Sequence, residues 1–233
     1  MKVLNIALLM TQFYYIMSNI IGIDLGTEYF KITVLKPGKP FTMVENLQSK
    51  TKTPTALAFK DEERFFGVDA IAKRARFPKQ VFTFMHEFLG KQYNDEVINK
   101  YISDFFIPYD ITQNEESSSI SFNIKFNKED YNFTTEEIFG MQFRYIKFLS
   151  DKFSNTDVRD CVITVPAYFG YKERNAIVQA VELSKLNLLS LVSENVAAAV
   201  QFSIDRMFNE TEYYMFYNMG SSNLQVTLAS FRS

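Results

Sequence analysis

The chain has 233 residues, a formal net charge of −2, 47% hydrophobic residues and 22% charged residues, which is ordinary for a globular protein. This length is enough for one or two domains with a sizeable core. The charge excludes the basic excess of a protein that follows nucleic-acid phosphates, so we expect no nucleic-acid partner. The single cysteine, Cys161, excludes an internal disulfide and is expected to be a buried small hydrophobe.

The first 18 residues form a distinct segment. Lys2 precedes an apolar run over 3–17, and the small Ser18 follows it, which is typical of a secretory signal peptide over 1–18. The run is short and contains polar residues, unlike a membrane span, so we expect no membrane association after cleavage. An uncleaved anchor or a first core strand is the alternative.

Two glycosylation sequons agree with a secretory route. They lie at Asn132 and Asn209, although such tripeptides also arise by chance. Because the chain cannot form a disulfide framework, the sequence favours the endoplasmic reticulum lumen over the cell exterior.

The apolar pattern predicts the first elements in chain order. Two strands joined by a turn come first, a hairpin turn follows at "PGKP", and Pro54 holds an extended segment. The period then becomes helical over 67–93, with a break at Pro78, and a strand is expected at "ISFNIKF". Thr134 and Glu137 have capping-box spacing and begin a long helix.

The remaining chain alternates strands and helices. The continuous apolar run "DCVITVPAYF" predicts a strand covered on both faces. A helix, the strand "LLSLVS", a helix from Glu194 and a final strand–turn–strand follow. This order predicts an α/β fold with a mixed sheet and flanking helices. Because no polar closing element follows the last hairpin, we expect the polypeptide to be cut short.

Two strand–turn–strand segments near opposite ends of the chain share one pattern. Each places a polar residue, one apolar residue, glycine and small polar residues between two apolar strands. Such tips expose backbone N–H groups that bind anions, and two facing tips would hold the phosphates of one nucleotide. Each turn alone could be an ordinary hairpin. The predicted phosphate-binding residues are Gly26, Thr27, Glu28, Gly220, Ser221, Ser222 and Asn223.

Several motifs together resemble the DnaK-type, seventy-kilodalton heat-shock chaperones. "IGIDLGTEY", "KTPTALAF", "RFFGVDA", "VITVPAYFGYKERNAIVQA", "SENVAAA" and "MFYNMGSSN" occur in the order of that family's nucleotide-binding domain. The family has the actin and sugar-kinase fold, which is ribonuclease H-like. "LKPGKP", "ERFFGVDA" and "FLGKQY" resemble the large endoplasmic reticulum branch, the hypoxia up-regulated or glucose-regulated chaperones.

The resemblance implies a domain organisation. The first lobe would have a core subdomain over 19–54 and 134–212, with an inserted peripheral subdomain over 55–133. The second lobe would begin over 213–233. Implied ligands are ATP or ADP with Mg²⁺, and unfolded client proteins and other chaperones are implied partners of a fuller chain.

The resemblance also implies residue roles. Asp24 and Glu194 would position waters on Mg²⁺, and Thr27 would bond the terminal phosphate. Pro166 would act in a relay to a partner domain. For Asp24 and Glu194, a strand-end cap is the alternative role.

The chain departs from the family pattern at several of these positions. His86 stands where the family has a lysine near the terminal phosphate, with a half-buried structural histidine as the alternative. Asn218 replaces an aspartate that helps to activate the attacking water, and an amide cannot take a proton. The other departures are Asn195, Asn223 and Gln225.

Four functional hypotheses follow. The first is an ATP-binding chaperone domain with impaired hydrolysis, acting in protein folding and stress response in the endoplasmic reticulum lumen. The second is a non-hydrolysing co-chaperone or interaction fragment. The third is a sugar kinase of the same fold, which "TVPAYF" argues against. The fourth is a truncated gene product without a stable fold.

Overall fold

The computed structural model describes residues 19–36 and 38–232. The predicted signal peptide over 1–18 lies outside these residues. Among the described helices, none is both long and apolar enough to cross a bilayer.

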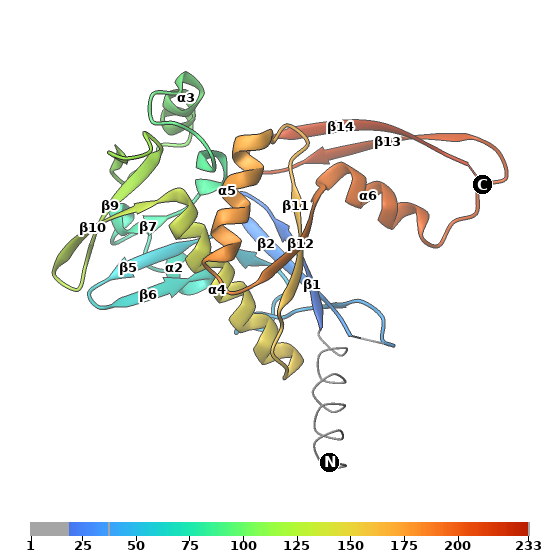
Figure 1. Cartoon of the computed structure of the whole chain (residues 1–233), viewed down its shortest axis with the longest axis horizontal. Coiled ribbons are helices and arrows are strands. Elements are labelled where there is room, and N and C mark those ends of the chain that lie inside the picture. Colours follow the sequence, from blue (N-terminus) through green and yellow to red (C-terminus); the bar gives the residue numbers. More distant parts are fainter. Residues whose placement is uncertain (1–18, 37, 233) are drawn as a thin grey trace, which may run out of the picture.

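A six-stranded mixed sheet forms the centre of the molecule, in the order β12-β11-β1-β2-β3, with β4 also pairing with β2 (Figure 1). β1, β11 and β12 run parallel, while β2 is antiparallel to β1. The mixed sheet predicted from the sequence is therefore confirmed. Its strands are β1 (Ile20–Leu25), β2 (Tyr29–Leu35), β3 (Thr42–Met43), β4 (Thr53–Pro54), β11 (Asp160–Val165) and β12 (Asn187–Ser193).

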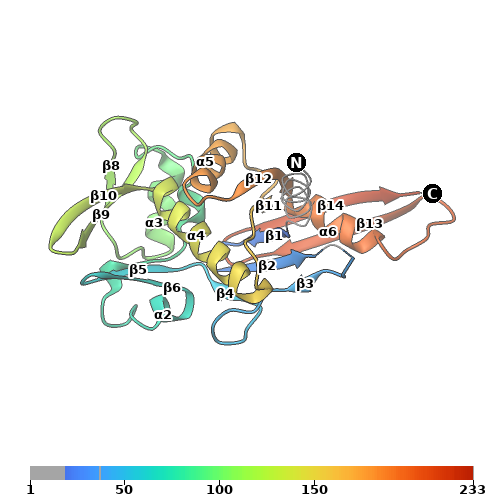
Figure 2. The same cartoon turned by 60° about the horizontal axis from the view of Figure 1, so that its bottom comes forward.

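Two helices pack together beside this sheet (Figures 1 and 2). α4 (Thr135–Ser154) begins with the expected capping box, because Thr134 accepts from the Glu137 N–H and the Glu137 carboxylate accepts from the Thr134 N–H. α4 contacts α5 (Tyr171–Glu182) closely at a glycine of α4, where an added methyl group would lie only 2.9 Å from Leu183 Cβ.

The core is apolar and includes the cysteine. Cys161 is fully buried in β11, and burial, with a smaller effect of the nearby Asp160 charge, raises the pKa of its thiol to about 12. The alternate residues Ile163 and Val165 are also fully buried, while Val162 and Thr164 are half-buried. Cys161 is therefore the buried small hydrophobe that the sequence indicated.

Two three-stranded sheets, β6-β5-β7 and β10-β9-β8, lie on the other side of α4 from the C-terminal hairpin (Figure 1). Phenylalanine rings connect them, with Phe82 packed edge-on against Phe59 and Phe122. The division into a core and an inserted subdomain stays a prediction. The elements here are β5 (Leu57–Lys60), β6 (Glu63–Phe66), α2 (Gly67–Ile71), β7 (Val81–Phe82), α3 (Glu96–Asp104), β8 (Ile111–Gln113), β9 (Ile120–Phe126) and β10 (Glu129–Thr134).

The helix predicted over 67–93 is wrong for most of its length. Only α2 is an α-helix there, and it is followed by a 3₁₀ turn at Pro78–Gln80, β7 and a second 3₁₀ turn at Met85–Phe88. The hydrophobic spacing that suggested a helix instead buries Phe82 and Phe88 from two separate short elements.

The last described elements are α6 (Glu194–Ser203) and a long hairpin of β13 (Glu212–Met219) and β14 (Leu224–Phe231). The hairpin strands pair along their full length, and α6 lies against them (Figure 1). The tip of this hairpin points back towards the end of β1, which brings the second glycine turn to the first.

Candidate functional site

The two glycine turns share one backbone hydrogen bond, from the glycine N–H to the carbonyl three residues later. The Gly26 N–H donates to the Tyr29 carbonyl at 3.1 Å, and the Gly220 N–H donates to the Asn223 carbonyl at 2.9 Å. A Cβ atom at Gly26 would lie 2.5 Å from the Tyr29 carbonyl oxygen, so this turn requires glycine. The repeated sequence pattern therefore corresponds to a repeated four-residue turn, Gly26 to Tyr29 and Gly220 to Asn223.

The tips of the two turns touch each other. Thr27 Oγ1 and Ser222 Oγ are 2.8 Å apart, although the residues are 195 positions apart in the chain. Thr27 is buried, whereas Ser222 is half-buried. The structure thus brings the two predicted phosphate-binding turns together at one point.

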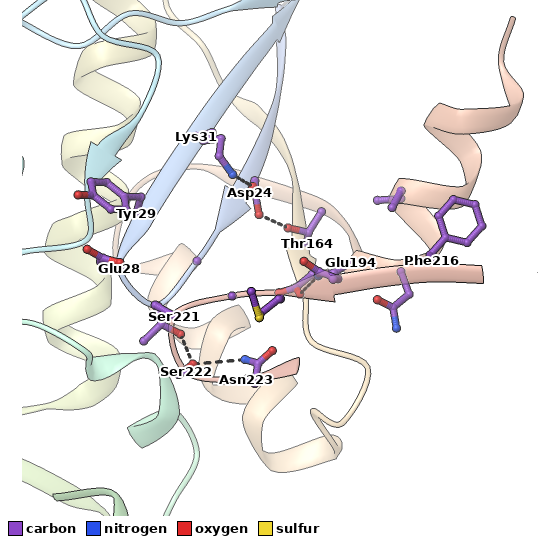
Figure 3. Close-up of a pocket in the computed structure, with 18 of the residues that line it drawn as sticks. Asp24, Glu28, Tyr29, Lys31, Thr164, Glu194, Phe216, Ser221, Ser222 and Asn223 are labelled. Atoms are coloured by element: carbon purple, nitrogen blue, oxygen red, sulfur yellow. Dashed lines mark hydrogen bonds and ion pairs between the residues drawn. The ribbon is translucent and has the colours of Figure 1, made fainter. Parts of the chain in front are cut away.

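A cavity of about 950 Å³ opens beside this contact (Figure 3). The ends of β1 and β2, the start of α6 and the β13–β14 tip form its walls. All the predicted phosphate-binding residues line it, together with Asp24, Glu194 and Asn218. Its other polar lining residues are Lys31, Thr33, Lys52, Thr164, Asn195 and Gln201.

Asp24 lies at the C-terminal part of β1 and faces the cavity (Figure 3). Lys31 Nζ forms an ion pair with Asp24 Oδ2, and the Thr164 hydroxyl lies 3.3 Å from Asp24 Oδ1. Both carboxylate oxygens of Asp24 therefore already have partners from neighbouring strands.

Glu194 begins α6 directly after β12 and is bonded to the hairpin. Gln225 Nε2 donates to Glu194 Oε2 at 2.8 Å, and Asn218 Nδ2 approaches the same oxygen at 3.3 Å. Burial raises the pKa of the Glu194 carboxyl, and the negative charge of Asp24 acts in the same direction, against the lowering effect of these amide bonds. Two departures from the family pattern, Asn218 and Gln225, thus serve here as hydrogen-bond donors to one carboxylate.

Glu87 lies behind the contact between the tips. Its Oε1 accepts from the Tyr168 hydroxyl at 2.8 Å and from the Ser222 hydroxyl at 3.3 Å. Although burial opposes ionisation, the contacts of Glu87 with His86, Tyr168 and Ser222 outweigh it and lower the pKa of its carboxyl. Asn223 Nδ2 in turn donates to the Tyr168 hydroxyl at 3.0 Å, so the hairpin tip is bonded to the segment that follows β11.

His86 itself does not line the cavity. It is 1% exposed, its ring stacks on Phe169 at 5.0 Å, and its Nδ1 lies 3.8 Å from Glu87 Oε1, too far for a hydrogen bond. Neither ring nitrogen has a hydrogen-bond partner among the described residues. This position fits the structural alternative better than a role at the terminal phosphate.

The described residues offer no magnesium site built from side chains alone, and the two carboxylates expected to hold Mg²⁺ through waters, Asp24 and Glu194, both have protein partners. Within residues 19–36 and 38–232, no group of three or more histidine, cysteine, aspartate or glutamate side chains could hold a metal ion. Mg²⁺ requires near-octahedral oxygen ligands and retained waters. Here one carboxylate is paired with Lys31 and the other accepts from two amides.

Pro166 and the sequons lie outside the cavity. Pro166 is buried at the end of β11, and the N–H of the next residue, Ala167, donates to Gln225 Oε1 at 3.1 Å. Asn132 and Asn209 are both exposed. The roles expected of these residues stay predictions.

Sequence reasoning did not identify four residues that shape the site: Lys31, Lys52, Glu87 and Tyr168. For Lys31 a signal was present. In "YFKITVL" the apolar residues alternate, so the remaining residues face away from the core, and this is the cavity side of β2. For Glu87 and Tyr168 no local pattern distinguishes them from their neighbours.

Comparisons with known proteins identify a matching family and several relatives of the chain. The family described as "Hsp70 protein" matches residues 20–233. Hypoxia up-regulated protein 1 of Xenopus tropicalis is 34% identical over 217 residues, which is 92% of this chain and 33% of that protein. The corresponding proteins of Danio rerio (34%) and Homo sapiens (32%) match 92% and 91% of this chain, but only 22% and 21% of their own lengths. The chain therefore spans only a fifth to a third of the length of these relatives.

Proposed function

The chain belongs to the Hsp70 family, and from this premise we propose that it is the nucleotide-binding part of an ATP-binding chaperone, holding nucleotide phosphates between its two glycine turns. Members of this family bind ATP with Mg²⁺. The single observation that carries the proposal is the 2.8 Å contact between Thr27 and Ser222 beside a polar cavity. Phosphate oxygens entering here would meet backbone N–H groups of both tips.

We propose that hydrolysis in this site is slow. Asn218 lies in the cavity and points its amide nitrogen at Glu194. An amide cannot accept a proton from an attacking water, and the loss of a general base typically costs about 10²–10⁴ in rate. This supports nucleotide binding over rapid turnover, and it keeps the non-hydrolysing co-chaperone as the second candidate.

We place this activity in the endoplasmic reticulum lumen, in protein folding and stress response. The support is the predicted signal peptide over 1–18, the exposed sequon residues Asn132 and Asn209, and the similarity to hypoxia up-regulated protein 1. Unfolded client proteins and other chaperones are the proposed partners if a fuller chain exists.

Isothermal titration with ATP and with ADP, in excess Mg²⁺, tests the proposal. The matched variants are Gly220→Ala, at the second tip, and Gly22→Ala in β1. An added Cβ at Gly220 would make only an ordinary 3.5 Å contact with Asn223, and one at Gly22 would meet nothing within 4 Å, so both variants should fold.

We expect the unmodified chain and Gly22→Ala to bind nucleotide with similar affinity. Gly220→Ala should weaken binding at least about tenfold, because the methyl group blocks close approach of a phosphate to the backbone. If the unmodified chain binds neither nucleotide, the proposed function is wrong for this chain.

A further inference from the structure

The cavity between the turns carries its own positive charges. Its lining residues include Lys31 and Lys52 together with Asp24, Glu28 and Glu194, and the Lys52 ammonium lies over the Tyr29 ring at 4.0 Å. A polyphosphate next to carboxylates normally requires a bound cation to offset the repulsion. Here two ammonium groups are available at the same wall.

Lys31 is held in this wall by strand pairing. In the antiparallel ladder of β1 and β2, Lys31 is the direct partner of Asp24, and its ammonium forms an ion pair with that carboxylate. The side chains of both residues are 45% exposed, so the ammonium still faces the cavity. An ammonium has three donors, so the ion pair with Asp24 leaves donors for a phosphate oxygen.

One oxygen of the second carboxylate, Glu194 Oε2, has two amide donors and no cation beside it. Glu194 accepts from Gln225 at 2.8 Å and from Asn218 at 3.3 Å. If these two residues were acids, three carboxylates would converge on the same point, and a bound cation or a proton would have to offset their repulsion. Because both residues are amides, the site carries two fewer negative charges than it would with two acids. Each amide also supplies an N–H donor to Glu194.

We propose that this site binds the phosphates of a nucleotide without a divalent cation. The Lys31 ammonium, which is paired with Asp24, and the amides of Asn218 and Gln225 take the place of the cation. This inference rests on the proposed nucleotide-binding function. A lysine ammonium acts as a point charge for phosphate. Because Lys31 is part of the chain and lies at the cavity, its charge is present without the binding of a metal ion from solution.

Calorimetric titration of ADP into the unmodified chain, once in excess Mg²⁺ and once in excess EDTA, tests this inference directly. We expect the two dissociation constants to agree within about threefold, which corresponds to less than 1 kcal/mol. A loss of binding of about tenfold or more in EDTA would overturn the inference and leave the proposed function in place. No binding in either buffer would contradict the proposed function, and this inference with it.

Two variants assign the effect to named residues. Lys31→Met should lose at least about tenfold in ADP affinity in EDTA and recover in Mg²⁺. Lys125→Met, at an exposed strand position of β9 outside the cavity, should behave as the unmodified chain in both buffers. Unchanged binding by Lys31→Met in EDTA would contradict the role of Lys31.

The amides are tested separately. The double variant Asn218→Asp, Gln225→Glu places two more carboxylates beside Glu194, and its ADP binding should become dependent on Mg²⁺ by at least about tenfold. Circular dichroism melting of each variant checks that it is folded. If the double variant does not melt cooperatively, Asn218→Asp alone, at an exposed position, gives the same contrast. Equal affinity of the folded variant in Mg²⁺ and EDTA would contradict the role of the amides.

Discussion

At the scale of single residues, the replacement of an acid by an amide changes both charge and bonding. Asn218 and Gln225 both donate to Glu194, so each substitution changes a residue that would repel this carboxylate into one that binds it. The hairpin tip is thereby attached to the start of α6 through hydrogen bonds. An amide at position 218 cannot take a proton, which is the basis of the proposal that hydrolysis is slow.

An aspartate at position 218 should therefore increase the rate of ATP hydrolysis. We expect Asn218→Asp to raise ATP hydrolysis at least about tenfold in saturating Mg²⁺, because a carboxylate at this position can take a proton from water. Phosphate release under single-turnover conditions measures the rate. Asn209→Asp, an exposed change outside the cavity, is the matched control and should leave the rate unchanged. An unchanged rate in Asn218→Asp would mean that this residue does not limit hydrolysis.

His86 and Glu87 show that the sequence alone does not predict which of two adjacent side chains faces the hairpin tip. The resemblance placed His86 near the terminal phosphate, with a structural histidine as the alternative; in the structure His86 is buried on Phe169, while Glu87 reaches Ser222. These adjacent residues lie in a 3₁₀ turn that follows Phe84, whose backbone is left-handed at φ 58°. This unusual backbone angle sets which side chain faces the hairpin tip, and no local pattern predicts it.

At the scale of elements, strong local signals predicted the structure best. The capping box at Thr134 and Glu137 marked the first turn of α4, and the glycine turns marked the strand–turn–strand units. These features depend on residues a few positions apart. By contrast, the region over 67–93 depends on distant pairing, because β7 exists only through its bonds to β5, and this pairing overrides the helical spacing.

The capping box gives a prediction for the stability of α4. Thr134→Ala removes the side-chain acceptor for the Glu137 N–H and should lower the free energy of unfolding by about 1 kcal/mol. Chemical denaturation followed by circular dichroism measures the change. Thr134→Ser keeps the hydroxyl and should retain most of the stability. Equal stability of the alanine variant and the unmodified chain would mean that water replaces this cap without cost.

At the scale of the whole molecule, the two faces of the β13–β14 hairpin differ sharply. One face packs aromatic rings against α6, with Phe202 close to both Tyr214 and Phe231. Most side chains of the other face are apolar, and these apolar side chains are between 51% and 72% exposed. They are Tyr213, Met215, Tyr217, Met219, Leu224, Val226 and Leu228. A contiguous apolar face of this kind favours association.

We therefore expect this chain in isolation to self-associate through the hairpin as its concentration rises. Met215 and Leu228 are direct cross-strand partners at the middle of this face, 70% and 68% exposed. The double variant Met215→Lys, Leu228→Glu replaces them with an opposite-charge pair that the strand pairing tolerates. Because burying each apolar side chain contributes about 1.5–3 kcal/mol, losing two should weaken association at least about tenfold.

Sedimentation velocity over a concentration series measures this association. The matched control is Asn132→Lys, Asn123→Glu, which introduces the same charge pair at exposed cross-strand partners of the β9–β10 hairpin. This control should associate as the unmodified chain does, because its pair lies far from the apolar face (Figure 1). An unmodified chain that stays monomeric throughout the series, or a control that dissociates as readily as the test variant, would contradict the role of the hairpin face. Dissociation of the test variant alone would assign the association to the side of β13 and β14 that faces away from α6.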